Sequence, residues 1–239
     1  MCGRYALYGP RSRSRAEEEY FAGLDLFPPS WNVAPTDTMP ICRLVDGRPE
    51  LVAAKWGLIP ARATDPRVGG KKINAPCENI LKWAEYREPY RAMRRCLVPA
   101  SGFYEWIGPK GAKRAYHVVH AELERLAFAG LWGAWSGPAG EEVLSYSILT
   151  TEPNDIMRPL KDRMPVILAP ADYERWLTTG DAEALLRPAH NEVLYAYEVG
   201  PRVGSVKNND PSLIDPIEEA DRRYLEQREG GMDVAQVRE

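Results

Sequence analysis

The spacing of hydrophobic and polar positions along this 239-residue chain predicts a fold rich in short strands. Short runs of apolar and aromatic residues, bounded by glycine, proline and charged residues, are typical of β-strands. Strands are predicted over residues 39–44, 50–56, 96–98, 102–107, 115–120, 126–132, 144–150, 164–168 and 195–199. The first two would form a hairpin around Asp46-Gly47, a dipeptide that favours tight turns.

Helices are predicted over residues 14–24, 80–95 and 172–177, with a continuation over 181–186, where apolar residues recur at helical spacing. Few helices around many strands predict an α+β fold with a predominantly antiparallel, barrel-like β-sheet core flanked by helices. No linker-like stretch interrupts residues 1–216, which we predict to form one domain. Residues 217–239 are rich in charge and are predicted to be a flexible tail.

Composition narrows the class of protein. With 44% hydrophobic residues the chain can bury a substantial core. No stretch approaches the roughly 18 apolar residues that a membrane helix needs, and arginines interrupt any signal-peptide pattern. The four cysteines lie far apart without a Cys-x-x-Cys pair, which argues against a disulfide framework and a zinc site. We expect a soluble, cytoplasmic, monomeric protein without a metal or other cofactor.

The net charge of −3 conceals an uneven distribution. Residues 71–114 hold ten basic and four acidic side chains, so this segment carries +6 and the rest of the chain carries −9. A basic segment in an acidic protein is suited to binding phosphate, although a solvated helix face is the more frequent explanation.

Cys2 directly follows the initiator methionine and is small enough for Met1 to be removed. Removal would leave a free α-amine, with a pKa of about 7.7–8.0, beside a thiol with a pKa of about 8.5. Such a 1,2-aminothiol condenses with an aldehyde to an imine and then closes through sulfur into a thiazolidine ring. On its own, however, a cysteine at position two is more often incidental.

Two further segments carry candidate chemistry. Asn74 follows a Gly-Gly loop, and its amide can donate and accept hydrogen bonds at once, although asparagine is also common in turns. Glu105 lies in an aromatic, strand-like run, where burial would raise its pKa and let it exchange protons near neutrality. Pairing with an arginine would instead make Glu105 structural, and the sequence leaves both readings open.

Thr150 ends a predicted strand, and the loop after it reaches Lys161-Asp162-Arg163. Three charged residues in a row before an apolar strand suggest a rim that meets a ligand. A solvated loop is the alternative.

Considered together, these segments resemble one family. The motifs that carry the resemblance, in chain order, are Cys2-Gly3-Arg4-Tyr5, Trp31-Asn32-Val33-Ala34-Pro35, Trp56-Gly57-Leu58-Ile59-Pro60, Asn74-Ala75, Gly102-Phe103-Tyr104-Glu105-Trp106, Asp162-Arg163-Met164-Pro165 and Val206-Lys207-Asn208. From residue 2 to about residue 216 the chain looks like an SRAP domain, the SOS-response-associated peptidase family of abasic site processing proteins.

The resemblance implies a specific chemistry. Family members lose the first methionine and use the exposed Cys2 to capture the ring-opened aldehyde of an abasic site in single-stranded DNA, forming a thiazolidine crosslink. Removal of Met1 by autoproteolysis and β-elimination at the lesion are linked to the same residues. By resemblance, Asn74 would position Cys2 and the opened sugar, and Glu105 would be the catalytic acid and base.

The resemblance also implies DNA contacts. Arg4 would contact a phosphate, and Trp56 and Trp106 would wall the site or support a base. In the predicted rim, Thr150 and Arg163 would add further contacts.

Two positions depart from the family pattern. Pro76 stands where the family has an arginine that touches a phosphate, and Lys161 stands where it has a histidine that moves protons near the lesion. Covalent capture is therefore expected to be intact, with proton transfer and reversal altered. Two alternatives are a non-covalent single-strand binding module and an N-terminal-nucleophile peptidase acting on proteins.

Overall fold

The computed structural model describes residues 2–9, 15–123, 125–180 and 182–223. Its centre is a closed barrel of five strands, each hydrogen-bonded to the next and the last to the first. In order around the barrel these are β10 (Glu142–Thr151), β4 (Arg48–Trp56), β3 (Thr38–Val45), β6 (Arg95–Ala100) and β9 (Leu126–Ser136). Within this ring only the β4–β10 pair is parallel. The predicted α+β fold with a predominantly antiparallel, barrel-like core is therefore confirmed.

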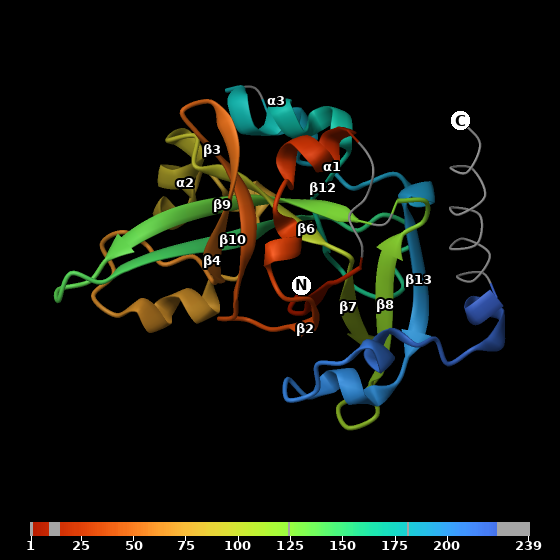
Figure 1. Ribbon diagram of the computed structural model, residues 1–239. Coiled ribbons are helices and arrows are strands. Elements are labelled where there is room, and N and C mark those ends of the chain that lie inside the picture. The colour runs from red at the N-terminus through yellow and green to blue at the C-terminus, as the bar shows by residue number, and fades with distance from the viewer. Residues whose placement is uncertain (1, 10–14, 124, 181, 224–239) are drawn as a thin grey trace.

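A second, fully antiparallel sheet lies beside the barrel (Figure 1). Its strands in spatial order are β13 (Leu194–Val199), β8 (Arg114–His120), β7 (Gly102–Ile107), β1 (Tyr5–Leu7) and β2 (Ser30–Val33). Figure 1 draws the N-terminal end of the chain between this sheet and the barrel.

Strand β1 is buried on both of its faces. Successive side chains of a strand point to opposite sides, so Tyr5 packs into the barrel core and Ala6 into a smaller cluster with Tyr104. The Tyr5 ring packs edge-on against the ring of Trp56, with 5.1 Å between the ring centres. The Tyr5 hydroxyl lies 2.7 Å from the hydroxyl of Tyr146. These contacts fix the strand that carries the N-terminus.

The helices α1 (Arg15–Tyr20), α2 (Ala84–Arg91) and α3 (Tyr173–Thr178) pack against the barrel strands β4, β9 and β6, respectively. All three are short. In the predicted segment 181–186 the described residues form only a 3-10 turn, Glu183–Leu185.

The prediction of one helix over residues 80–95 is wrong at both ends. Trp83 has an extended backbone, so α2 begins only at Ala84. Met93 has a positive φ of 56°, which a helix cannot accommodate, and Arg95 already begins β6. The helix predicted over 14–24 likewise ends early, before Gly23 takes a left-handed conformation with φ of 83°.

Three strands of only three or four residues were not predicted: β1, β2 and β5 (Asn74–Pro76). The strand predicted over 164–168 is interrupted at Val166, giving β11 (Met164–Pro165) and β12 (Ile167–Leu168). β5 and β11 flank the last residues of β10, and this arrangement builds much of the candidate site.

Part of the predicted tail contacts the second sheet. The Ile217 N–H donates to the Glu198 carbonyl, and the Tyr195 hydroxyl donates to Asp221. The rest of the predicted tail, residues 224–239, lies outside the described residues.

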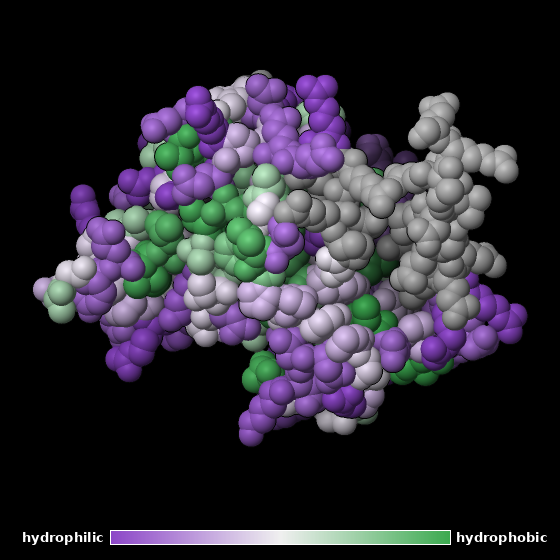
Figure 2. All heavy atoms as spheres, viewed as in Figure 1, coloured by the Kyte–Doolittle hydropathy of each residue, from purple (hydrophilic) through white to green (hydrophobic). Residues whose placement is uncertain are grey.

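Figure 2 shows hydrophobic side chains gathered in the middle of one face of the molecule. Hydrophilic residues surround them. None of the described helices is both long and apolar enough to span a bilayer.

Candidate functional site

The pairing of β1 with β7 brings the N-terminal segment to Glu105. Tyr5 pairs with Phe103, and the Tyr104 N–H donates to the Arg4 carbonyl at 2.9 Å. Continued by two residues from the Tyr5–Phe103 pair, this antiparallel register sets Gly3 opposite Glu105, and Gly3 is next to Cys2 in the chain. Cys2 is fully buried in this fold.

Asn74 binds the Cys2 residue directly. Its amide nitrogen donates to the Cys2 carbonyl at 2.7 Å, although 72 residues separate the two in sequence. The amide oxygen of Asn74 is buried and has no hydrogen-bond partner within the described part of the chain. A buried acceptor therefore lies beside Cys2, suited to orient an amine or a hydroxyl.

Three contacts hold Asn74 in this position. β5 pairs in parallel with β10, with Asn74 opposite Ile148. The Tyr86 hydroxyl donates to the Asn74 carbonyl at 3.0 Å, and the indole N–H of Trp56 donates to the carbonyl of the preceding residue, Ile73, at 3.0 Å. The sequence motifs did not indicate Tyr86, whose only signal is an aromatic residue at helical spacing.

Glu105 is 3% exposed, and burial raises the pKa of its carboxyl to about 7, from an ordinary value of 4.5. The nearby charge of Lys161 and a backbone hydrogen bond with Trp106 oppose this rise. A carboxyl with such a pKa can both donate and accept a proton at neutral pH.

The Cys2 thiol is kept protonated in this state. Burial raises its pKa far above the ordinary value, and the negative charge of Glu105 raises it further. The thiol lies 3.7 Å from the Arg4 carbonyl. Glu105 acts on the pKa of Cys2, and Lys161 acts on that of Glu105, so Glu105 lies within electrostatic reach of both of these predicted residues.

Arg4, predicted to contact a phosphate, makes contacts within the protein. Its guanidinium donates to the Asn32 side chain at 2.6 Å and to the Val203 carbonyl at 3.0 Å, and lies 5.7 Å from the ring centre of Trp106. Asn32 is 4% exposed and was not predicted as a site residue. An asparagine between Trp31 and Val33 in an apolar motif was the one signal for it.

Arg163 and Thr150, also predicted to contact DNA, contact each other. The Arg163 guanidinium donates to the Thr150 carbonyl at 2.6 Å and binds Glu78 through two hydrogen bonds of 2.8 and 3.0 Å. Thr150 is fully buried. In this state Arg163 therefore joins β10 and β11 to the residues after β5.

The two predicted tryptophans differ in exposure. Trp56 is fully buried and supports β5 from inside the protein, so its ring does not offer a surface for a base in this conformation. Trp106 is partly exposed, with its ring against Arg4 and Tyr104.

The basic stretch 71–114 does not form one uniform phosphate-binding surface. Arg95 is 2% exposed, lies between the rings of Tyr90 and Trp176, and donates to main-chain carbonyls. Lys72 and Arg114 form ion pairs with Glu85 and Glu198. Among the described residues, no group of three or more histidine, cysteine or acidic side chains is arranged to hold a metal.

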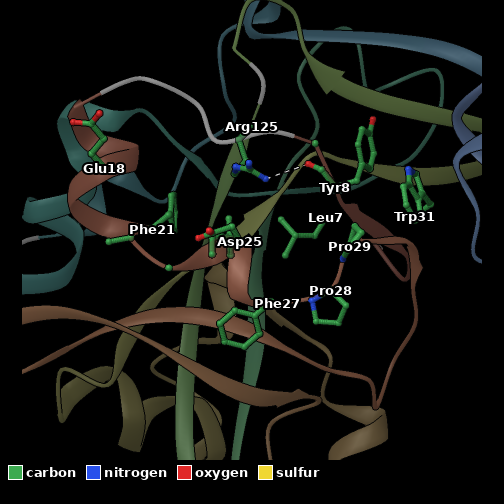
Figure 3. Close-up of a pocket in the computed structure, with 14 residues that line it drawn as sticks. Leu7, Tyr8, Glu18, Phe21, Asp25, Phe27, Pro28, Pro29, Trp31 and Arg125 are labelled. Carbon is green, nitrogen blue, oxygen red and sulfur yellow. Dashed lines mark hydrogen bonds between the residues drawn. The ribbon is translucent and has the colours of Figure 1, made fainter.

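A cavity of about 590 Å³ opens at the far end of β1 (Figure 3). Leu7, Tyr8, Phe27 and Trp31 line it, and Arg125 at its edge donates to the Tyr8 carbonyl at 3.4 Å. At about 3.3 Å per strand residue, it lies roughly 15–20 Å along the chain from Cys2. None of the predicted site residues lines it.

Burial of Glu105 makes stability depend on pH. The folded protein holds more protons on this carboxyl than the unfolded chain between pH 4.5 and 7. The contribution of this proton binding to the free energy of unfolding is fully present below pH 4.5. It is lost as pH rises toward 7, by up to about 1.4 kcal/mol per pH unit. Glu105→Gln should therefore be more stable than wild type above pH 7. Urea unfolding at several pH values measures this, and identical pH profiles for the two proteins would contradict it.

Comparisons with known proteins agree with the motifs. The family model described as SOS response associated peptidase (SRAP) matches residues 1–206. The abasic site processing protein YoqW of Bacillus subtilis is 35% identical over 225 residues, covering 90% of this chain and 99% of YoqW. The abasic site processing protein HMCES of Gallus gallus is 28% identical over 91% of this chain and 78% of its own.

Solved structures show the same fold. A crystal structure of a protein from Bacteroides thetaiotaomicron has a TM-score of 0.71 at 28% identity, covering 79% of this chain and 85% of that one. A crystal structure from Bordetella bronchiseptica has a TM-score of 0.70 at 25% identity, covering 83% and 100%. With a family model over most of its length and a relative 35% identical along nearly all of it, this chain belongs to the SRAP family of abasic site processing proteins.

Proposed function

We propose that this protein captures the ring-opened aldehyde of an abasic site in single-stranded DNA through Cys2. The Cys2 α-amine attacks the aldehyde carbon, and loss of one water gives an imine. The thiol then adds its sulfur to the imine carbon and its proton to the nitrogen, closing a thiazolidine. The overall step releases one water and needs no oxidant, reductant or cofactor.

The observation that carries this proposal is the convergence of Cys2, Asn74 and Glu105 at the junction of the two sheets. Asn74 holds the Cys2 carbonyl and leaves a buried acceptor beside it. Glu105, with a pKa of about 7, can protonate the leaving water and later accept the thiol proton. Because the thiol is protonated, ring closure requires such a base nearby.

Removal of Met1 is part of the proposal, since only then does Cys2 have a free α-amine. We assign this cleavage to the protein itself, as autoproteolysis. The imine also permits a lyase branch, in which a base removes a proton beside the imine carbon and the 3′-phosphate leaves by β-elimination. N-terminal mass spectrometry of the purified protein tests the first step, and an intact Met1 in the active protein would contradict it.

A single-stranded substrate suits this site because the opened sugar must reach a nucleophile buried between two sheets. The partly exposed ring of Trp106 is suited to support a neighbouring base. Arg4, Thr150 and Arg163 would contact the strand only if some of their internal contacts opened. Their proposed role in this state is to hold the site residues in place.

The experiment uses single strands in which uracil glycosylase has converted one uracil to an abasic site. A shifted band that survives heat and denaturant indicates the covalent adduct. A shift on native gels alone would support the non-covalent binding module, an alternative that the departures from the family pattern at Pro76 and Lys161 permit. No shift on either gel, together with cleavage of a protein substrate, would support the peptidase alternative.

Lys161 provides a test of how the adduct is released. A lysine ammonium remains charged at neutral pH, whereas a histidine exchanges protons there. We propose that Lys161 acts as a fixed positive charge and that release of the adduct is slow. Lys161→His should then speed release between about pH 6.5 and 7.5.

Lys161→Ala should weaken DNA binding and flatten its dependence on salt. Release is measured by the decay of the denaturation-resistant band, and binding by titration at several salt concentrations. Unchanged release in Lys161→His, with an unchanged salt dependence in Lys161→Ala, would make Lys161 an ordinary loop residue.

A further inference from the structure

Residues 203–209, called here the 203–209 loop, are held by one buried side chain. The Asn32 amide nitrogen lies within hydrogen-bond distance of three loop carbonyls, those of Val203 at 3.3 Å, Ser205 at 3.0 Å and Asn208 at 2.7 Å. From the loop, Asn209 accepts a hydrogen bond from the Trp31 N–H at 2.7 Å. The loop is therefore fixed to β2 from both of its ends.

The middle of this fixed loop faces solvent. Val206 is 60% exposed, and the neighbouring Lys207 is also exposed. No ion pair or hydrogen bond of the Lys207 ammonium is present among the described residues, whereas Arg202 just before the loop is paired with Asp210 at 2.8 Å. The loop thus presents an apolar side chain and a cation together on a rigid support.

The 203–209 loop is joined to the nucleophile segment. Arg4, two residues after Cys2, donates to both Asn32 and the Val203 carbonyl, and its guanidinium lies against Trp106. One side chain therefore links the segment that bears Cys2, the partly exposed Trp106 and the base of the loop. None of the catalytic roles assigned above uses Val206 or Lys207.

We propose that the 203–209 loop is a DNA-contacting element that fixes the strand beside the abasic nucleotide. Lys207 binds a backbone phosphate, and Val206 packs against the adjoining sugar or base. Surface loops held on a rigid scaffold commonly carry binding residues, and pre-ordering of the loop avoids an entropy cost on binding. In this arrangement Arg4 is a positioning residue, which sets the loop relative to Cys2. The inference rests on the proposed function, since it takes the same DNA strand as the ligand.

The test separates binding from covalent chemistry by using a single strand with a tetrahydrofuran abasic analogue, which has no aldehyde. Lys207→Ala should reduce the slope of log affinity against log salt by about 0.7, the value for one phosphate contact to a single strand. Val206→Asp should weaken binding about tenfold, the order of one lost base contact, while Val206→Ile should bind like wild type. Fluorescence anisotropy at several salt concentrations gives both quantities.

Matched changes elsewhere control for charge alone. Leu26→Asp places the same charge at a residue that is 84% exposed, and Lys110→Ala removes a cation from the β7–β8 turn. Both should bind like wild type, and thermal unfolding checks that every variant folds. Binding within about twofold of wild type for Lys207→Ala and Val206→Asp, with an unchanged salt slope, would overturn the inference. The proposed function is tested separately, by the adduct on abasic strands, and that result would not affect it.

Discussion

Cys2→Ala is expected to abolish the heat-stable adduct with abasic single strands while native binding to the same strands persists. Only residue 2 offers an amine and a thiol together once Met1 is removed, and alanine at this position keeps the amine alone. The variant should therefore form at most an imine, which borohydride traps and which otherwise hydrolyses. Denaturing gels with and without borohydride measure the difference.

Two controls make the result specific. Cys2→Ser keeps a nucleophile of similar size and should also give an adduct only after reduction. Cys77→Ala removes the partly exposed thiol beside β5 and should form the adduct like wild type. If Cys2→Ala and Cys2→Ser both gave full-strength heat-stable bands, a lysine elsewhere would be the nucleophile and the proposed mechanism would be wrong.

The chemical centre of the site could be predicted from the sequence because its members stand in local motifs. Asn74 and Glu105 were singled out by residue type and neighbours, and the fold brings both to Cys2. The register of β1 on β7 brings Glu105 to the segment that bears Cys2, which no sequence pattern could show. Their catalytic roles remain predictions.

The surrounding contacts could not be predicted because they join residues far apart in the chain. Asn32 reaches a loop more than 170 residues later, and Arg163 pairs with Glu78 across 85 residues. An arginine in a sequence motif has the same appearance whether it meets a phosphate or a carboxylate. Which group such an arginine pairs with depends on the folded structure and cannot be predicted from its motif.

The fold class could be predicted from the strand pattern, whereas the shortest elements could not. β1 and β5 have three residues each, too few for alternation to show, and yet they carry the site. The second helix was predicted to run to Arg95, whereas Met93 takes a positive φ that a helix cannot accommodate. Local backbone conformation of this kind is set by packing rather than by residue type.

Glu105→Gln is expected to slow adduct formation by about 10²–10⁴-fold, the effect of losing a positioned general acid and base. Glutamine keeps the shape and hydrogen-bonding capacity of the side chain but cannot transfer a proton to or from the imine. The substitution should lower the rate of adduct formation at saturating DNA and should change binding to the tetrahydrofuran strand little.

The pH profile distinguishes this role from a structural one. With a pKa of about 7, Glu105 should produce a bend in the wild-type rate near pH 7. Glu105→Gln should lose this bend and keep only the one set by the Cys2 α-amine, whose pKa is about 7.7–8.0. Glu198→Gln serves as the matched control, since that carboxylate pairs with Arg114 on the second sheet and should affect neither the rate nor the bend. Single-turnover kinetics across the neutral range give both measures. If Glu105→Gln formed the adduct within about threefold of the wild-type rate and with the same pH profile, Glu105 would have only a structural role. Another group would then carry out the proton transfers.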